Sequence, residues 1–70
     1  MIALLTDFGL EDSFVASMKA VIYSINPNVK IVDITHAVSP QNIKEAAFHL
    51  KVCYKYFPKA TIFVCVVDPG

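Results

Sequence analysis

Two aspartates in this sequence each follow a short apolar run that is typical of a buried strand. Asp7 comes directly after Ile-Ala-Leu-Leu-Thr, and Asp68 comes directly after Ile-Phe-Val-Cys-Val-Val. Continuous apolar runs of this length are typical of parallel sheets, in which both faces of a strand are covered. Parallel strands end at the same edge of a sheet, and ligands bind at that edge. We therefore expect Asp7 and Asp68 to lie within the breadth of one ligand.

A carboxylate at a strand end can accept hydrogen bonds from hydroxyl groups, bind a metal or act as a base. Asp12 is a third candidate, shortly after the first strand. Each of the three also has a purely structural interpretation, which the sequence leaves open. Asp7 precedes Gly9 in a turn, Asp12 is suited to cap a helix, and Asp68 precedes Pro-Gly, which favours a turn.

The histidines and cysteines give weaker signals. His36 follows the second apolar segment on the ligand side of the sheet, and is either a site residue or a hydrogen-bonded loop histidine. His49 lies within a helical pattern and is expected at or near the surface. Cys53 and Cys65 lack the spacing of metal ligands, so we expect buried free thiols in a reducing compartment and no metal site. Glycine-rich phosphate-binding loops are absent from the sequence.

The elements that must position these residues alternate along the chain. The patterns predict strands at residues 2–6, 29–34 and 62–67, and helices at residues 14–25 and about 41–57. A β-α-β-α-β order predicts a parallel sheet with right-handed crossovers. The predicted fold class is therefore α/β, the amino-terminal part of a Rossmann-like three-layer domain.

Local signals predict how the helices begin and which residues they bury. Asp12 and Ser13 are suited to cap the first helix, and Ser39 is suited to cap the second, with Pro40 in its first position. The second helix is expected to pack through Ile43, Ala47, Leu50, Val52, Tyr54 and Phe57.

Composition limits the classes of function. The chain has 70 residues, of which 56% are hydrophobic, so we expect one small domain with surfaces that other protein covers. Six lysines balance six acidic residues and arginine is absent, which argues against a nucleic-acid partner. No apolar run approaches the ~20 residues of a membrane span, and no leader pattern precedes the first strand, so a cytoplasmic location without membrane contact is expected. Because the chain stops just after the third strand, we expect it to be the first piece of a larger domain.

A series of short motifs runs through the chain in order and without a gap. They are Leu4-Leu5-Thr6-Asp7-Phe8-Gly9, Met18-Lys19-Ala20-Val21-Ile22, Ile25-Asn26-Pro27, Ile31-Val32-Asp33-Ile34-Thr35-His36, Pro40-Gln41-Asn42-Ile43, Glu45-Ala46-Ala47-Phe48, Tyr56-Phe57-Pro58-Lys59 and Val66-Val67-Asp68-Pro69-Gly70. In these motifs the chain resembles the S-adenosylmethionine hydroxide adenosyltransferase family, the SAM hydrolases, which are related to the fluorinase and chlorinase enzymes. Residues 1–70 match only the first portion of the family's amino-terminal domain.

The resemblance implies hydrolysis of S-adenosyl-L-methionine to adenosine and L-methionine, by attack of water or hydroxide on the ribose 5′ carbon. It implies that Asp7 accepts hydrogen bonds from the ribose hydroxyls and that Asp68 is catalytic, as part of an Asp-Arg-His set that handles the attacking water. Phe8, Asp12 and Gln41 are the further positions at which we expect substrate contacts. The resemblance implies no cofactor, because S-adenosyl-L-methionine is the substrate.

Departures from the relatives refine these expectations. The halide-using relatives lack an aspartate at the position of Asp68, and the fluorinase has a tryptophan at that of Gln41, so the resemblance implies water over halide. The arginine and histidine of the catalytic set would lie beyond Gly70, so this chain is expected to be inactive alone. The full-length family member is expected to be a homo-oligomer, a trimer.

Two other functions remain open at this point. A receiver-like phosphoacceptor domain also carries acids after the first and third strands of a parallel sheet, although only one acid directly follows the first strand here. A non-catalytic interaction module is the second alternative, because an incomplete site cannot turn over.

Overall fold

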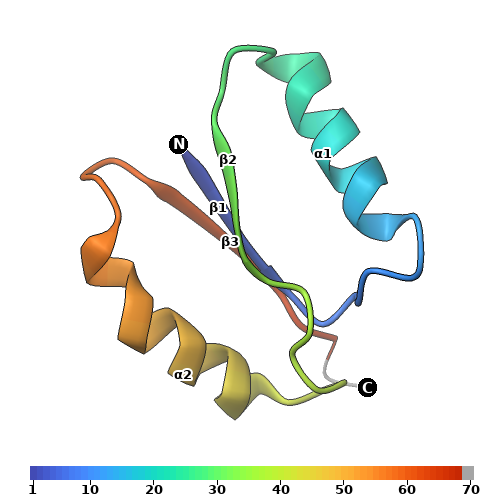
Figure 1. The fold of residues 1–70 in the computed structure, drawn as a ribbon, viewed down its shortest axis with the longest axis vertical. Helices are drawn as coiled ribbons and strands as arrows, with labels where there is room; N and C mark the ends of the chain where they lie inside the picture. The colour runs from blue at the N-terminus through green and yellow to red at the C-terminus, as the bar shows by residue number, and fades with distance from the viewer. Residues whose placement is uncertain (69–70) are drawn as a thin grey trace.

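The computed structural model describes residues 1–68 and has the predicted α/β fold. The elements are β1 (Ile2–Thr6), α1 (Phe14–Ile25), β2 (Ile31–Thr35), α2 (Ile43–Cys53), a short 3-10 helix η1 (Tyr54–Tyr56) and β3 (Ile62–Val66). The strands form a three-stranded parallel sheet in the order β2-β1-β3. The two long helices lie on opposite sides of this sheet, as Figure 1 shows. The predicted β-α-β-α-β parallel sheet is confirmed.

The core of the molecule is centred on β1. Ala3, Leu4, Leu5 and Thr6 are completely buried, because β1 pairs with a strand on each side and lies between the helices. Leu5 continues into a cluster with Val38 and Ala46, which joins β1 to the segment around α2. Burial of a leucine side chain contributes about 1.5–3 kcal/mol, so β1 is the main anchor of the fold.

The prediction that the third strand is buried on both faces is wrong for the described chain. β3 is an edge strand, and its Ile62 and Val66 side chains are 60% and 38% exposed. The reason is that β3 pairs with β1 alone, and no element among residues 1–68 covers its outer edge. Cys53 and Cys65 are free thiols as predicted, but Cys53 is half-buried and Cys65 is exposed.

The start of the second helix also differs from the prediction. Ser39 and Pro40 precede the helix, and its N-cap is Asn42, whose side chain accepts a hydrogen bond from Glu45 N at 2.9 Å. Gln41 has a φ of 65°, a left-handed conformation that no α-helical residue can have, so the helix begins only after it. Ser39 instead donates its backbone N–H to Glu45 Oε2 at 2.6 Å.

The first helix has the predicted bounds. Ser13 is its N-cap residue, but its side chain makes no capping hydrogen bond. Asp12 lies one residue earlier, and its Oδ1 accepts a hydrogen bond from Ser13 N at 2.6 Å. Of the two residues expected to cap this helix, only Ser13 therefore occupies the N-cap position.

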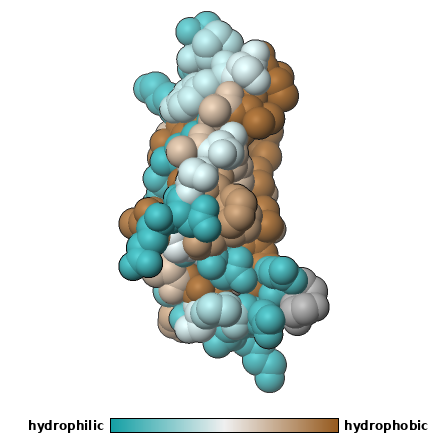
Figure 2. Space-filling view, turned by 90° about the vertical axis from the view of Figure 1, so that its right-hand side faces the viewer, coloured by the Kyte–Doolittle hydropathy of each residue, from teal (hydrophilic) through white to brown (hydrophobic). Residues whose placement is uncertain are grey.

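Several apolar residues that were predicted to pack remain exposed. In α2 and η1, Ile43, Val52 and Tyr54 are 57%, 47% and 55% exposed. Phe57 and Phe63 do pack, with ring centroids 5.3 Å apart. Figure 2 shows hydrophobic residues gathered along one long edge of the molecule. Within residues 1–68, no helix has the length and apolar character needed to cross a membrane.

Candidate functional site

Asp7 joins the loops that follow all three strands. It lies directly after β1, and its Oδ2 accepts hydrogen bonds from the backbone N–H groups of Asp68, at 3.2 Å, and Gln41, at 3.4 Å. Its own N–H donates to the carbonyl oxygen of Val66 in β3, at 3.3 Å. The prediction that Asp7 and Asp68 lie together at the carboxyl edge of the sheet is confirmed.

A cavity of about 680 Å³ opens at this edge. It is lined by Asp7, Phe8, Phe14, Met18, Pro40, Gln41 and Asp68. Small-molecule sites have volumes of about 300–1,000 Å³ and combine apolar walls with a few polar groups, so this cavity has the size and the chemistry of a ligand site. Two aspartates and a glutamine supply its polar groups, and aromatic rings and a thioether supply the apolar wall.

Four of the five site residues predicted from the sequence line this cavity, and Asp12 does not. Asp12 lines a second cavity, of about 660 Å³, which is formed by the continuous segment from Phe8 to Ser13. Phe8 belongs to both cavities, so the two adjoin. A substrate contact by Asp12 thus stays a prediction, and it would involve the adjoining cavity.

The sequence prediction missed Phe14, Met18 and Pro40 as lining residues. Phe14 and Met18 both belong to α1, and Phe14 is 57% exposed at the start of that helix. Its ring contacts that of Phe8, with centroids 5.9 Å apart at 56°. The usable signal was the position of an aromatic residue in the first turn of a helix that follows a ligand-side loop.

Backbone conformation brings the loops to the cavity. Gly9 has a φ of 74° and donates its N–H to the carbonyl oxygen of His36 at 2.7 Å, which ties the loop after β1 to the loop after β2. Gln41 has a φ of 65°, which costs a non-glycine residue about 1–2 kcal/mol. That conformation directs the Gln41 N–H toward Asp7, so the strain lies at the candidate site.

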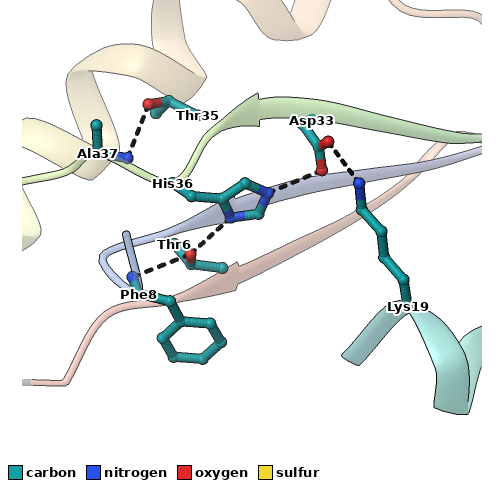
Figure 3. Close-up of polar contacts among 7 residues, drawn as sticks. All are labelled: Thr6, Phe8, Lys19, Asp33, Thr35, His36 and Ala37. Carbon is teal, nitrogen blue, oxygen red and sulfur yellow. Dashed lines mark hydrogen bonds and ion pairs between the residues drawn. The ribbon is translucent and has the colours of Figure 1, made fainter. Parts of the chain in front are cut away.

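His36 is a buried, hydrogen-bonded histidine, as one of its two sequence interpretations proposed. Its side chain is 2% exposed, its Nδ1 is 2.7 Å from Thr6 Oγ1, and its Nε2 is 2.8 Å from Asp33 Oδ1 (Figure 3). Thr6 Oγ1 also accepts a hydrogen bond from Phe8 N at 3.1 Å. His49, by contrast, is half-buried in α2 and contacts the ring of Phe48.

Asp33 completes this group of side chains. Its Oδ2 is 2.6 Å from the ammonium group of Lys19 in α1. Burial alone would raise the pKa of Asp33, but the hydrogen bonds from Lys19 and His36, together with their charges, outweigh burial and lower that pKa below its usual value. Asp33 therefore carries a negative charge at neutral pH.

The chemistry of the cavity follows from its charges. Two carboxylates beside aromatic and thioether side chains suit a ligand that has hydroxyl groups, an apolar ring system and a positive charge. Among residues 1–68, no group of three or more His, Cys, Asp or Glu side chains is placed to bind a metal ion.

Comparison with known proteins identifies close relatives. The family model of the SAM hydroxide adenosyltransferase N-terminal domain matches residues 2–70. The chain is 44% identical to an (R)-S-adenosyl-L-methionine hydrolase of Thermus thermophilus over 94% of its length, which is 26% of that relative. It is 40% identical to the hydrolase of the same name from Methanocaldococcus jannaschii, over 99% of its length and 27% of the relative. A fluorinase of Actinoplanes sp. is 35% identical, over 100% of this chain and 24% of the relative.

Solved structures give the same result for the fold. The crystal structure of an uncharacterized conserved protein from Thermotoga maritima has a TM-score of 0.96 and 47% identity, covering 100% of this chain and 27% of that one. A conserved hypothetical protein from Thermus thermophilus has a TM-score of 0.90 and 42% identity, covering 99% and 29%. The chain spans about a quarter of the length of the relatives that it matches.

Proposed function

Because the chain belongs to the SAM hydroxide adenosyltransferase N-terminal domain family, we propose that it supplies part of a site for hydrolysis of S-adenosyl-L-methionine to adenosine and L-methionine. The observation that carries the proposal is the meeting of Asp7 and Asp68 at the cavity beside the carboxyl edge of the sheet. The family match also removes the support for a receiver-like phosphoacceptor domain.

Asp7 binds the ribose. Its Oδ2 is engaged by the N–H groups of Gln41 and Asp68, whereas among residues 1–68 no hydrogen bond reaches its Oδ1. Oδ1 is thus available to accept hydrogen bonds from the two ribose hydroxyls, as an acidic residue does in dinucleotide-binding folds. The backbone donors already hold the carboxylate in place, so ligand binding costs little further conformational entropy of the Asp7 side chain.

The apolar wall accommodates the rest of the nucleoside. Phe8 and Phe14 present a tilted pair of rings, and Met18 adds a flexible thioether beside them. Gln41 adds an amide that can hydrogen-bond to a polar edge of the ligand. Asp12, in the adjoining cavity, is a further candidate for contact with a part of the substrate outside the main cavity.

Asp68 acts on the attacking water. In the reaction, a water oxygen forms a bond to the ribose 5′ carbon while the bond from that carbon to sulfur breaks. The electron pair of the breaking bond goes to sulfur, which becomes the neutral thioether of L-methionine, and the water loses a proton. A carboxylate held near the reacting carbon orients the water, and its charge favours the loss of that proton.

Water is favoured over halide as the nucleophile. The identity of the chain to the Thermus thermophilus hydrolase, 44%, exceeds its identity to the Actinoplanes fluorinase, 35%. The chain contains no arginine and spans about a quarter of these relatives, so we propose that residues 1–70 alone bind adenosine without turnover.

A chimera tests this proposal. The matching first segment of the Thermus thermophilus hydrolase is replaced by residues 1–70, and adenosine release from S-adenosyl-L-methionine is followed chromatographically. We expect turnover by the chimera and none above a no-protein control by the 70-residue chain. Asp68→Asn in the chimera should abolish turnover and leave the Kd for adenosine within about threefold, because the amide keeps the shape and removes only the charge.

The controls separate catalysis from folding. Circular dichroism must show the same unfolding temperature for the chimera and its Asp68→Asn variant. Full turnover by the folded Asp68→Asn variant would refute the catalytic role of Asp68. A folded chimera that binds no adenosine would refute the proposed function of this chain.

A further inference from the structure

A continuous hydrogen-bonded series of side chains connects the surface of α1 to the backbone of Phe8 at the cavity. It runs from Lys19 through Asp33 and His36 to Thr6, and ends at the N–H of Phe8 (Figure 3). Thr6 is completely buried and His36 is 4% exposed, so the two central members are shielded from water. Each buried polar group in such a position would cost about 1–3 kcal/mol if its partner were removed.

The donors and acceptors in the series have one consistent direction when the imidazole is neutral. Asp33 carries a negative charge and can only accept, so the proton of His36 resides on Nε2. Nδ1 then accepts the hydroxyl proton of Thr6, and the remaining lone pairs of Thr6 Oγ1 face the N–H of Phe8. Loss of the Thr6 hydroxyl would therefore remove both its bond to His36 and the acceptor for the Phe8 amide.

An irregularity of the sheet creates the contact between Thr6 and His36. Ile2 pairs with Ile31 and Leu4 with Asp33, but Leu5 pairs with Thr35, so the register shifts by one residue between Leu4 and Leu5. The shift brings His36 level with Thr6. Register irregularities of this kind often occur next to functional sites, where they redirect a side chain.

We infer that Thr6 and His36, held by Asp33, are positioning residues that fix the Asp7–Phe8 segment for nucleoside binding. The inference rests on the proposed function for the identity of the ligand. Asp7 directly follows Thr6, and Phe8 is anchored to Thr6 Oγ1 by its N–H, so the series fixes both sides of the residue that is proposed to bind ribose. The cavity lining includes none of Thr6, His36 and Asp33.

The neighbouring strand offers a matched control. Thr35 Oγ1 accepts a hydrogen bond from Ala37 N at 3.0 Å, the same two-residue arrangement as Thr6 with Phe8. Neither Thr35 nor Ala37 lines the main cavity or the adjoining one. Thr6→Val and Thr35→Val are thus the same chemical change, made at a residue within the hydrogen-bonded series and at a residue outside it.

The experiment measures adenosine affinity and the Phe8 amide in the same 15N-labelled 70-residue chain. Thr6→Val should weaken adenosine binding about tenfold, which corresponds to about 1.4 kcal/mol, because the Phe8 anchor is lost. Thr6→Ser, which keeps the hydroxyl, should bind within about twofold of the wild type, and so should Thr35→Val. Asp33→Ala, a change at a partly exposed site, should weaken adenosine binding at least about threefold. It should also shift the 15N resonances of the His36 ring.

The readouts distinguish a positioning role from a merely structural one. If Thr6→Val lowers the unfolding temperature but keeps the wild-type Kd for adenosine, the series supports stability alone and the inference is overturned. If Thr6→Val does not fold, Asp33→Ala decides by the same comparison of affinity with unfolding temperature.

Failure of the proposed function has a different signature. If the wild-type chain binds no adenosine, that function fails, and the amide spectra then decide the inference. Positioning requires faster hydrogen exchange at the Phe8 amide in Thr6→Val, with shifted resonances for the Gln41 and Asp68 amides that bond to Asp7. Unchanged resonances at these amides would overturn the inference as well.

Discussion

The two carboxylate oxygens of Asp7 differ in their hydrogen bonds. Oδ2 accepts the N–H groups of Gln41 and Asp68, and so holds together the loops that follow β2 and β3. Oδ1, to which no hydrogen bond is made within residues 1–68, is the oxygen that we propose to bind the ribose. Under that proposal a single side chain couples the shape of the cavity to ligand binding, so its removal should affect both.

Asp7→Ala should weaken binding of adenosine and of S-adenosyl-L-methionine to the chimera by about 1–3 kcal/mol each, because charge-assisted hydrogen bonds to the ribose are lost. Isothermal titration measures both affinities. Asp7→Asn is the matched control, since its amide oxygen can still accept hydrogen bonds from the backbone donors but lacks the charge. Its affinity should lie between that of the wild type and that of Asp7→Ala. Equal affinity of Asp7→Ala and the wild type would rule out ribose binding by Asp7.

Asp33 gives the fold a small dependence on pH. Its pKa is lowered in the folded chain, so it stabilises the fold above its unfolded pKa of about 3.9, and this contribution is lost as pH falls through the lower folded pKa. The side chains of Lys19 and Asp33 are 31% and 38% exposed, so solvent screening keeps the contribution below about 1 kcal/mol.

Asp33→Asn should therefore lower the free energy of unfolding slightly at pH 7 and have no effect near pH 2. Urea unfolding of the wild type and the variant at pH 7, 5, 3 and 2 measures the difference. Added salt at pH 7 should reduce it, because the ion pair is partly solvated. A difference that grows on acidification would contradict the lowered pKa.

The residues of the site differ in how far the sequence could predict them. Asp7 and Asp68 were predicted to meet because each directly follows a strand, and parallel strands share an edge. The partnership of Thr6 with His36 could not be predicted, because the two are 30 residues apart and meet only through the register shift between Leu4 and Leu5. No local pattern in the sequence marks that shift.

At the scale of elements, the apolar periodicity predicted each helix and strand but not the positions where backbone strain ends an element. The second helix was expected to begin with Ser39 as its cap, a choice that depends on side-chain type alone. The positive φ of Gln41 moves the start to Ile43 and gives the capping role to Asn42. A long-range contact, that of the Gln41 N–H with Asp7, helps to hold this non-glycine residue in the left-handed conformation.

Ala60 tests the cost of such strain away from the site. It lies in the turn that leads to β3 and has a φ of 66°, which costs about 1–2 kcal/mol for a residue with a Cβ. Ala60→Gly removes that strain but adds about 0.4–1 kcal/mol of conformational freedom to the unfolded chain. We expect the free energy of unfolding to rise by about 0.5–1 kcal/mol in urea titrations.

The neighbouring Lys59→Gly is the matched control, since Lys59 does not have a positive φ. It should destabilise the chain, because it adds unfolded-state freedom without relieving strain. Destabilisation by Ala60→Gly to the same extent would show that the turn stores no strain.

At the scale of the whole molecule, the sequence contains more apolar surface than these elements bury. β3 was predicted to be buried because of its continuous apolar run, and it is instead an edge strand with Ile62 60% exposed. An apolar cavity of about 300 Å³ lies between α2 and the sheet, bordered by Ile43, Leu50 and Val67 among others. The continuous apolar sequence of β3 is typical of a strand that is buried on both faces, but the actual burial of β3 depends on what packs around it.

This excess of apolar surface predicts that the 70-residue chain associates with itself. Within residues 1–68 the outer edge of β3 has no partner strand, so it presents free backbone donors and acceptors. The neighbouring exposed apolar side chains add a favourable contact area, so a second copy can pair along β3. Light scattering coupled to size exclusion should show a mass that increases with protein concentration.

Val64→Lys and Ile62→Lys separate the causes of association. Ile62 is exposed on the edge strand, so its replacement by lysine should reduce association without loss of structure, because charged side chains block edge pairing. Val64 is half-buried and pairs with Leu4 in the central strand, so its replacement should unfold the chain instead. A compact monomer with a cooperative unfolding transition at every concentration would contradict the prediction, and it would show that a β-α-β-α-β unit with a single central strand can be stable with its edge uncovered.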